Sequence, residues 1–289
     1  MRRFLAPSGA IFGAPLRYGL ACVLAFATCA RADLSGSGNA PSYTAASIVN
    51  AATQTPGPLA PNTIATVYGT NLSWDTYAIT PADLSGGSLP QTVHGVTVFV
   101  GGLTTSIYYV SPTQINFLIP YELIPGPVTI YVARDGVGGP KVTVQLDQAS
   151  PGFFEWSGNM AIAEHGDPSV CASDPAAQLA GCLVSGEFPA SPGETIVLYA
   201  AGLGHTSPNT QSGLLARQPA QIASLANLEI VLDGNAVPPQ NILYAGLTPG
   251  FAGLYQINLR LPDSFAPNPV IQIVIGSDSS PATVQLPTH

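Results

Sequence analysis

The fold is decided by the sequence QINFLIP at residues 114–120, which returns 142 residues later as QINLRLP at residues 256–262. A phrase that occurs twice in one chain indicates an internal repeat. In both copies the first isoleucine points to one face of a β-strand and the flanking amides point to the other, because side chains alternate along a strand. Proline cannot donate to a strand ladder, so it ends both copies. We therefore expect two versions of one β-rich unit.

Four further pairs of segments occur in the same order in the two halves of the chain. Each contains β-branched or aromatic residues between turn residues, as strands do. The pairs are 61–72 with 192–203, 96–102 with 228–234, 128–132 with 270–274, and 142–146 with 282–286. Gly-Gly at 101–102, Asp-Gly at 135–136 and Asp-Gly at 233–234 are signals for tight hairpin turns. Two β domains could share one such match by chance, but the shared order indicates a duplicated domain.

These strands predict an all-β protein of two tandem Ig-like antiparallel β-sandwich domains behind an N-terminal signal peptide. The 30 glycines and 28 prolines between short apolar runs suit a fold with many turns. A disordered chain is excluded, because 46% of the residues are hydrophobic and only 8% are charged. We expect the first sandwich at residues 43–148 and the second at 150–287, each without a long amphipathic helix.

Residues 1–32 have the pattern of a signal peptide. A positive region with three arginines precedes an apolar run at 20–27, and Ala-Arg-Ala at 30–32 fits the small-x-small cleavage pattern. The apolar run is shorter than the ~20 residues that span a bilayer. We expect cleavage after Ala32, a flexible leader at 33–42, no stable membrane insertion after cleavage, and a secreted or extracellular protein at the cell surface or in the periplasm. An uncleaved anchor or a buried helix is the alternative.

Charge excludes two classes of partner. Four of the eight basic residues leave with the signal peptide while all sixteen acidic residues stay, so the mature chain has a net charge of −12. Nucleic-acid binding needs clustered lysines and arginines that displace counterions from phosphates. The mature chain lacks such clusters, so we expect neither nucleic acid nor an anionic membrane surface as a partner.

Two cysteines, Cys171 and Cys182, remain after cleavage. Thiols outside the cytoplasm are usually oxidised, so we predict a disulfide between these two residues. A disulfide that closes a loop of this size stabilises a protein by about 3 kcal/mol in the chain-entropy model. Two free thiols are the alternative.

The repeated amides Gln114, Asn116, Gln256 and Asn258 are predicted to be a structural motif. Amide side chains at equivalent strand positions commonly hydrogen-bond the backbone of a neighbouring loop. A row of amides that binds sugar is the alternative, and the usual role of buried amides favours the loop contact.

The sequence contains no recognisable motif for catalysis, for a cofactor or for a metal ion. The four histidines form no His-Glu-x-x-His pair, and Gly-x-Ser-x-Gly and Gly-x-x-x-x-Gly-Lys are absent. We predict no catalytic residue, no cofactor and no metal site. The densest polar cluster is Glu164-His165-Gly166-Asp167, which we expect to be a solvated turn between two strands of the second unit. A metal site or an acid–base pair there is the alternative.

Aromatic residues offer another route to function. Several lie in predicted loops or at the boundary of the units: Trp74, Tyr77, Tyr108, Tyr109, Phe153, Phe154 and Trp156. An exposed row of rings would suit stacking on a polysaccharide, but most aromatics in small sandwiches pack in a core or between domains. Phe153 and Phe154 are beside the junction, so we expect them to pack between the units.

The mature chain resembles the Solibacter-type uncharacterised C-terminal domain family of secreted acidobacterial proteins. The segments that carry the resemblance are VNAA at 49–52, YGTNL at 68–72, QIN at 114–116, SPGFF at 150–154, LYAAGLG at 198–204 and YQIN at 255–258. The resemblance covers nearly all of residues 43–287. It implies tandem Ig-like units of the IPT/TIG type and no known reaction.

The preferred function is that of a secreted, non-catalytic protein with a structural, adhesion or assembly role at the cell surface. Its expected partner is an extracellular polysaccharide or a cell-surface protein. A carbohydrate-binding module is the first alternative, which a flat row of exposed aromatics would favour. An enzyme with an unrecognised site is the second, which convergent titratable groups in a deep pocket would favour.

Overall fold

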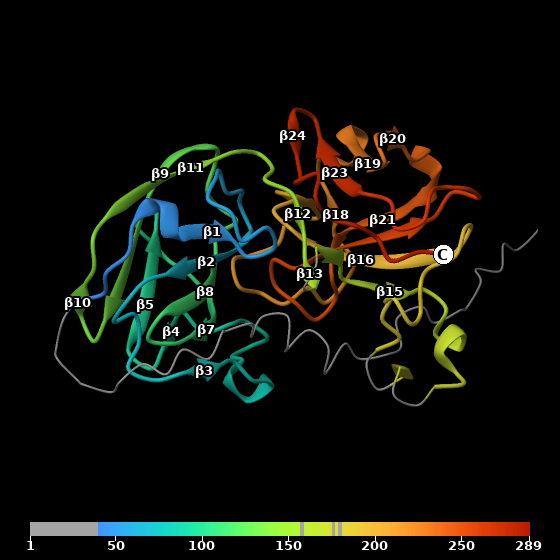
Figure 1. The fold of residues 1–289 in the computed structure, drawn as a ribbon. Coiled ribbons are helices and arrows are strands. Elements are labelled where there is room, and N and C mark those ends of the chain that lie inside the picture. Colours follow the sequence, from blue (N-terminus) through green and yellow to red (C-terminus); the bar gives the residue numbers. More distant parts are fainter. Residues whose placement is uncertain (1–39, 157–158, 175–176, 179–180) are drawn as a thin grey trace, which may run out of the picture.

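The computed structural model describes residues 40–156, 159–174, 177–178 and 181–289, and Figure 1 shows their ribbon. The predicted signal peptide at 1–32 and most of the leader at 33–42 lie outside the described residues. The long strands pair in an antiparallel manner in both halves of the chain. The predicted all-β, antiparallel β-sandwich class is therefore confirmed. Within the described ranges, no helix is both long and apolar enough to cross a membrane.

The first half consists of short strands joined by tight turns. The strands are β1 (Ile48–Asn50), β2 (Ile64–Tyr68), β3 (Tyr77–Ala78), β4 (Thr92–Val93), β5 (Val96–Val100), β6 (Leu103–Thr104), β7 (Ile107–Val110), β8 (Gln114–Leu118), β9 (Gly126–Arg134), β10 (Val137–Gly138) and β11 (Val142–Leu146). The 3-10 turn η1 (Ala45–Ser47) precedes β1, and η2 (Pro81–Asp83) lies between β3 and β4.

These strands form two sheets that enclose one core. One sheet has the order β1-β2-β8-β7-β3, and the other has the order β10-β9-β5-β4 with β11 beside β9 and β6 beside β5. On β5, Val96, Val98 and Val100 are buried in the core, while Thr97 and Phe99 between them are partly exposed. This alternation is expected of a strand that turns one face to a core.

The second half repeats this construction. Its strands are β12 (Gly152–Phe153), β13 (Glu155–Trp156), β14 (Met160–Ala161), β15 (Ala163–His165), β16 (Thr195–Ala201), β17 (Thr206–Ser207), β18 (Gln221–Ile222), β19 (Leu228–Leu232), β20 (Asn235–Ala236), β21 (Ile242–Leu247), β22 (Tyr255–Arg260), β23 (Ile271–Ile275) and β24 (Asp278–Ser279). The 3-10 turns are η3 (Pro168–Cys171), η4 (Leu225–Asn227) and η5 (Pro239–Asn241).

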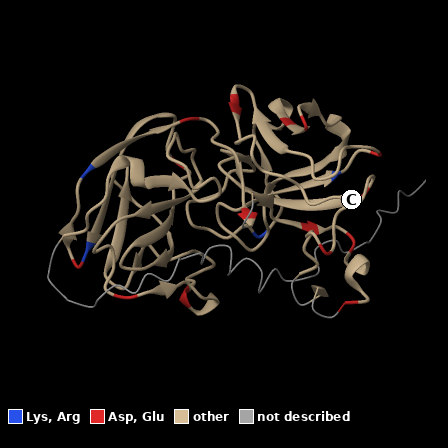
Figure 2. Cartoon of the chain, viewed as in Figure 1, with Lys and Arg blue, Asp and Glu red and all other residues tan. Residues whose placement is uncertain are grey.

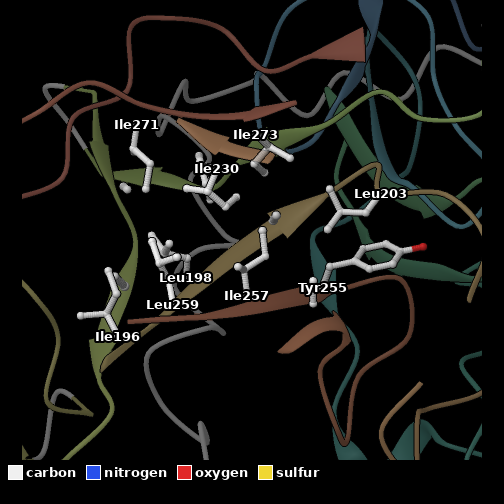
Figure 3. Packing of buried hydrophobic residues seen from close by; sticks show 14 of the residues in the cluster. Ile196, Leu198, Leu203, Ile230, Tyr255, Ile257, Leu259, Ile271 and Ile273 are labelled. Carbon is white, nitrogen blue, oxygen red and sulfur yellow. The ribbon is translucent and has the colours of Figure 1, made fainter. Parts of the chain in front are cut away.

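Two sheets again face each other in the second half. One has the order β12-β16-β22-β21-β18-β17 with β15 beside β16, the other has the order β20-β19-β23-β24, and β13 and β14 form a separate pair. Figure 3 shows Ile230 and Ile273 of one sheet opposite Leu198 and Ile257 of the other. These aliphatic side chains form the second core.

The two halves share their strand pairing and their register. β2, β8 and β7 are neighbours in the first half, as β16, β22 and β21 are in the second. Tyr68 lies opposite Gln114, and Tyr199 lies opposite Gln256. The repeated QIN phrase therefore has the same place in both sheets. The predicted hairpin turns are confirmed between β5 and β6, between β9 and β10, and between β19 and β20.

One of the expected segment pairs is displaced by a residue. Matching 128–132 with 270–274 sets Ile130 beside Gln272, but Ile130 lies opposite Val100 and the equivalent residue opposite Leu232 is Ile271. A slip of one residue moves every side chain of a strand to the other face, so burial of one face determines the register. The last pair also differs, because β11 has no strand counterpart at 282–286, where Gln285 makes isolated bridges.

A third apolar cluster lies between the two halves, and we call it the interunit cluster. Its buried members are Ala51, Ala52, Ile64, Leu89 and Leu118 from the first half and Phe154, Ile162, Tyr199, Ala201, Ala252 and Leu254 from the second. β16 buries both of its faces, since Leu198 faces the second core and Tyr199 faces this cluster. Phe154 packs between the units as expected, whereas Phe153, the last residue of β12, packs in the second core.

Buried and partly buried hydrogen bonds reinforce the contact between the halves. The Tyr108 hydroxyl donates to the Ala252 carbonyl oxygen at 2.6 Å and accepts from the Ala252 N–H at 2.9 Å. The Asn62 Nδ2 atom donates to the Tyr255 hydroxyl at 3.1 Å. Figure 3 shows that this hydroxyl points away from the labelled aliphatic residues of the second core. The two sandwiches are therefore joined by both apolar packing and polar contacts.

Candidate functional site

An exposed tryptophan lies where two hairpin turns of the first half meet a loop. The β4–β5 turn contains His94 and the β9–β10 turn contains Asp135, both with positive φ values. The two turns lie at the same end of the sheet, because Val96 is opposite Arg134 in the ladder of β5 and β9. The loop between β2 and β3 places Trp74 at this end, in contact with Arg134 and Asp135.

Trp74 is held from two directions. The Cζ atom of Arg134 lies 3.6 Å from the centroid of the indole ring, which is a cation–π contact. The indole N–H donates a hydrogen bond of 2.6 Å to Oδ2 of Asp135. Arg134 is only 3% exposed and donates from Nη1 to the Asn71 carbonyl oxygen, whereas Trp74 is 43% exposed. Trp74 is therefore an aromatic ring that is held in place and is still partly exposed to solvent.

A second group of side chains adjoins this ring. Asp75 follows Trp74 in the chain, and its Oδ2 atom lies 2.7 Å from Nδ1 of His94. The rings of His94 and Tyr77 are in contact, with centroids 4.3 Å apart. His94 is linked back to Asp135, because the carboxyl of Asp135 packs over Gly95 and would collide with any side chain there. We call Trp74, Asp75, Tyr77, His94, Arg134 and Asp135 the Trp74 platform.

The surroundings of the Trp74 platform carry negative charge. Hydrogen bonds from Thr80 hold the pKa of the Asp83 carboxyl below its usual range, and Asp83 accepts a hydrogen bond of 2.9 Å from the Tyr77 hydroxyl. Asp75 is 53% exposed, while the guanidinium of Arg134 is buried beneath the indole. Figure 2 shows acidic residues over both halves and few basic ones. A ligand at Trp74 therefore meets carboxylates and not an exposed cation.

The sequence indicated only part of this group. Trp74 and Tyr77 were expected in loops as candidates for stacking, but Asp75, Arg134 and Asp135 were not connected with them. The Asp-Gly hairpin signal at 135–136 was the available clue, because it ends a strand that pairs with the segment starting at Val96.

Most of the other aromatic candidates are used in packing. Tyr109 is buried, Tyr108 makes the contact to Ala252 between the units, and Trp156 packs against the interunit cluster. Phe99 and Tyr131 are stacked on each other with centroids 4.5 Å apart, so each ring covers a face of the other.

The Glu164–Asp167 cluster is not the solvated turn that was expected. Glu164 and His165 belong to strand β15, and adjacent strand residues point to opposite faces. Burial raises the pKa of the Glu164 carboxyl to about 7, partly offset by a hydrogen bond from Tyr199. On the other face, Nδ1 of His165 contacts Oε1 of Glu194, and Nε2 lies 3.1 Å from the Phe188 carbonyl oxygen. The two titratable groups therefore do not converge.

The predicted disulfide between Cys171 and Cys182 is confirmed, with Cα atoms 5.7 Å apart. Both cysteines are buried together with Ala177, and Phe188 packs against them. The disulfide therefore lies in a small core of its own, which anchors the loop after β15. Groups of at least three His, Cys, Asp or Glu side chains able to hold a metal ion are absent from the described part of the chain.

The repeated amides form the same hydrogen bond in both units. Nε2 of Gln114 donates to Oδ1 of Asn116 at 2.9 Å, and Nε2 of Gln256 donates to Oδ1 of Asn258 at 2.9 Å. Thr66 adds a hydroxyl donor to Asn116 at 3.0 Å. These bonds join side chains to one another, and the expected role in holding a loop backbone remains a prediction. Gln114 and Asn116 are buried, so they offer little surface to a sugar.

A polar groove lies at the junction of the two halves. Its volume is about 340 Å³, and its lining residues include Asn50, Thr53, Ser150 and Ser280. None of the lining residues carries a charge or an aromatic ring. The groove lacks the groups that general acid–base catalysis requires.

No family model matches the chain, and no curated protein matches it. Solved structures match with low similarity. The mixed-linkage glucan utilization locus protein SGBP-B of Bacteroides ovatus, in complex with a mixed-linkage heptasaccharide, is 13% identical with a TM-score of 0.29, over 75% of this chain and 36% of that one. The γ-CGTase of alkalophilic Bacillus clarkii is 15% identical with a TM-score of 0.26, over 58% and 24%. The plexin A4 extracellular region is 11% identical with a TM-score of 0.28, over 90% and 20%. The chain spans about a third or less of the length of these structures.

Proposed function

We propose that the protein is a secreted, non-catalytic tandem Ig-like module with a structural, adhesion or assembly role at the cell surface. The observation that carries this proposal is the interunit cluster. It buries Leu118 of the first half against Tyr199 and Leu254 of the second. Packing of this kind, with the Tyr108–Ala252 hydrogen bonds, supports a fixed arrangement of the two sandwiches. A fixed arrangement of two domains suits a protein that holds a fixed distance between partners.

Three features support a role outside the cytoplasm and without catalysis. The Cys171–Cys182 disulfide suits an oxidising compartment. Glu164 and His165, the adjacent titratable residues of the 164–167 cluster, point to opposite faces of β15. The groove at the junction has no titratable side chain among its lining residues.

Co-sedimentation tests the proposal. The purified protein is mixed with cell envelopes of the organism that makes it, and the soluble fraction is analysed for released sugar, peptide or acyl products. Saturable retention on the envelopes without product release is the expected result. Turnover of envelope material would contradict the non-catalytic role, and failure to be retained would contradict the adhesive one.

A carbohydrate-binding module is the second candidate function. One specific observation favours it, namely the fixed and exposed indole ring of Trp74 with Asp75 and His94 beside it. Aromatic rings with an open face and polar neighbours suit amphipathic ligands.

A further inference from the structure

We propose that the Trp74 platform is a binding site for one neutral pyranose residue of an extracellular polysaccharide, which stacks on the open face of the indole ring. This inference deepens the carbohydrate-binding candidate above and rests on the proposed binding role. It assigns the site, the chemical class of the ligand and the part played by each side chain.

The Trp74 ring offers a fixed apolar surface. The guanidinium of Arg134 lies over one face of the Trp74 ring, and Trp74 is still 43% exposed, so we assign the ligand to the opposite face. The hydrogen bond to Asp135 prevents rotation of the ring. A side chain that is already immobilised loses little conformational entropy when a ligand binds. A pyranose presents axial C–H groups on one face, and these pack well on an aromatic ring.

Asp75 and His94 supply hydrogen-bonding groups for sugar hydroxyls. The Asp75 side chain, next to Trp74 in the chain, is 53% exposed and the His94 side chain that it contacts is 41% exposed, so both are accessible to a ligand. A carboxylate accepts two or more hydrogen bonds, as from adjacent sugar hydroxyls. Asp75 also orients His94 through the contact of 2.7 Å, and Tyr77 supports the imidazole from the side. An apolar surface with a few placed polar groups is the usual composition of a small-molecule site.

The charges of the Trp74 platform favour a neutral sugar over a charged ligand. An anionic sugar would approach the carboxylates of Asp75 and Asp135 without an exposed cation to compensate, because Arg134 is 3% exposed. A cationic ligand would be attracted by the carboxylates of Asp75 and Asp135, but it would face the guanidinium across the ring, which lies 3.6 Å from the ring centroid. Two cations on the two faces of one ring repel each other. A neutral sugar meets neither penalty.

The aromatic surface at Trp74 is large enough for one sugar residue. Tyr77 is turned toward His94 and Asp83, and Phe99 and Tyr131 cover each other, so neither extends the Trp74 surface into a row. We therefore expect contact with a single pyranose and weak affinity for each site. Many copies bound along one polymer would retain the protein through avidity.

The chain offers a built-in optical test, because it has two tryptophans. Trp156→Phe leaves Trp74 as the only tryptophan, and Trp74→Phe is the matched control that leaves only Trp156. The probes are cellohexaose, xylohexaose, mannohexaose, an oligogalacturonate as the anionic sugar and choline chloride as the cation. We expect a saturable blue shift of the Trp156→Phe emission with at least one neutral hexasaccharide, and no such shift for Trp74→Phe.

Affinity electrophoresis in gels with the corresponding neutral polysaccharide gives the second readout. Trp74→Ala is expected to lower the affinity by about tenfold or more, and Asp75→Asn by a smaller factor. Tyr68→Ala removes an exposed aromatic residue outside the platform and should leave the affinity unchanged. Circular dichroism confirms that each variant is folded.

Three results would overturn the inference: no response to any neutral hexasaccharide, unchanged polysaccharide affinity in Trp74→Ala, or stronger binding of choline or oligogalacturonate than of the neutral sugars. The outcomes for the proposed function are separate. If Trp74→Ala still sediments with envelopes, the adhesive role stands without this site. If the unaltered protein binds neutral sugar but is not retained on envelopes, the site stands and the adhesive role is wrong.

Discussion

At the scale of single residues, Glu164 shows how burial changes the properties of a carboxyl group. It lies opposite Val197 in the ladder of β15 and β16, on the face that carries Tyr199. The surrounding apolar side chains raise its pKa to about 7 from the ordinary value of 4.5. The folded protein therefore holds a proton on Glu164 under conditions in which the unfolded chain has lost it.

This difference predicts that stability depends on pH through Glu164. A raised folded-state pKa contributes stability that is present below about pH 4.5 and is lost as the pH rises through about 7. Glu164→Gln removes the loss, so at pH 8.5 the variant should be more stable than the unaltered protein by up to about 3 kcal/mol, with little difference at pH 4. Urea unfolding at both pH values measures this. The exposed Glu229→Gln is the control, and a variant less stable at pH 8.5 would contradict the prediction.

The stability that His165 contributes is also expected to fall as the pH rises, but for a different physical reason. Desolvation lowers its pKa, but the hydrogen bond and charge of Glu194 and the contact with the Phe188 carbonyl raise it by more. The resulting stability is present below the unfolded value of 6.5 and is lost as the pH rises through the folded-state pKa. Glu194→Gln should therefore lower stability by about 1.5–3 kcal/mol at pH 5.5 and by less at pH 9.

Urea unfolding at pH 5.5 and pH 9 checks this prediction, with the exposed Glu187→Gln from the neighbouring loop as the control. An equal loss of stability in Glu194→Gln at the two pH values would mean that the charge of His165 plays no part.

The Trp74 platform illustrates which residue contacts a sequence can indicate. Trp74 and Tyr77 are conspicuous because large aromatics in a loop need an explanation. Asp75, His94 and Arg134 are ordinary polar residues in the sequence, and they meet only because two hairpin turns are adjacent in one sheet. The strand register brings them together, and it is known only when the pairing of β5 with β9 is known.

At the scale of elements, the two copies of the QIN strand offer a natural comparison. Asn116 accepts hydrogen bonds from Gln114 and Thr66 and is 2% exposed. In the second copy Asn258 accepts from Gln256 and is partly exposed, and the position of Thr66 is taken by Val197, which has no hydroxyl. The first copy therefore depends more on its asparagine.

Alanine substitution tests the difference between the copies. Asn116→Ala removes the acceptor of two buried donors and should destabilise the protein by about 1–3 kcal/mol. Asn258→Ala should have a smaller effect, because water can reach its partner. Thermal and urea unfolding of the two variants give the comparison directly. Equal effects, or none for Asn116→Ala, would show that the amide row does not support the strand.

The order of most strands was predictable, but the register around β23 and the absence of a strand at 282–286 were not. Alternating valines in β5 and the Asp-Gly turns have strong local signals. Around β23, however, either Val270 or Ile271 can be aligned with the apolar residues of β9. The run IQIVI has apolar residues on both faces of the strand, so the sequence alone does not choose between the two alignments. Only the opposing strand decides, since Ile273 pairs with Ile230 in the buried layer.

At the scale of the whole molecule, the interunit cluster predicts that both sandwiches unfold together. Gly253 lies at this contact with φ +68°, and a Cβ atom there would collide with Leu118 and lie 2.7 Å from the Asn62 carbonyl oxygen. Gly250 has φ +85° and nothing within 4 Å of its Cβ position. Gly253→Ala should therefore be less stable than Gly250→Ala by about 1–3 kcal/mol, although both place alanine at positive φ.

Scanning calorimetry measures the coupling. The unaltered protein should give one transition with equal calorimetric and van't Hoff enthalpies, and Gly253→Ala should broaden or split it while Gly250→Ala should not. Two separate transitions in the unaltered protein would show that the units unfold independently.

The contact between the units was only partly predictable. Phe154 beside the boundary pointed to packing there, and the nearly continuous apolar run of β16 is the pattern of a strand buried on both faces. No local sequence signal indicates which surface of the first half covers β16, because Ile64 and Leu118 also fit an ordinary core strand.

The same contact has a consequence for fragments of this chain. Either half made alone would expose the side chains of the interunit cluster to water, and apolar patches of that kind promote aggregation. A protease that removed one half would therefore leave the other prone to precipitate, and a gene fragment for one half would express poorly. Both halves of the chain therefore have to be synthesised before the apolar surface of either half is covered.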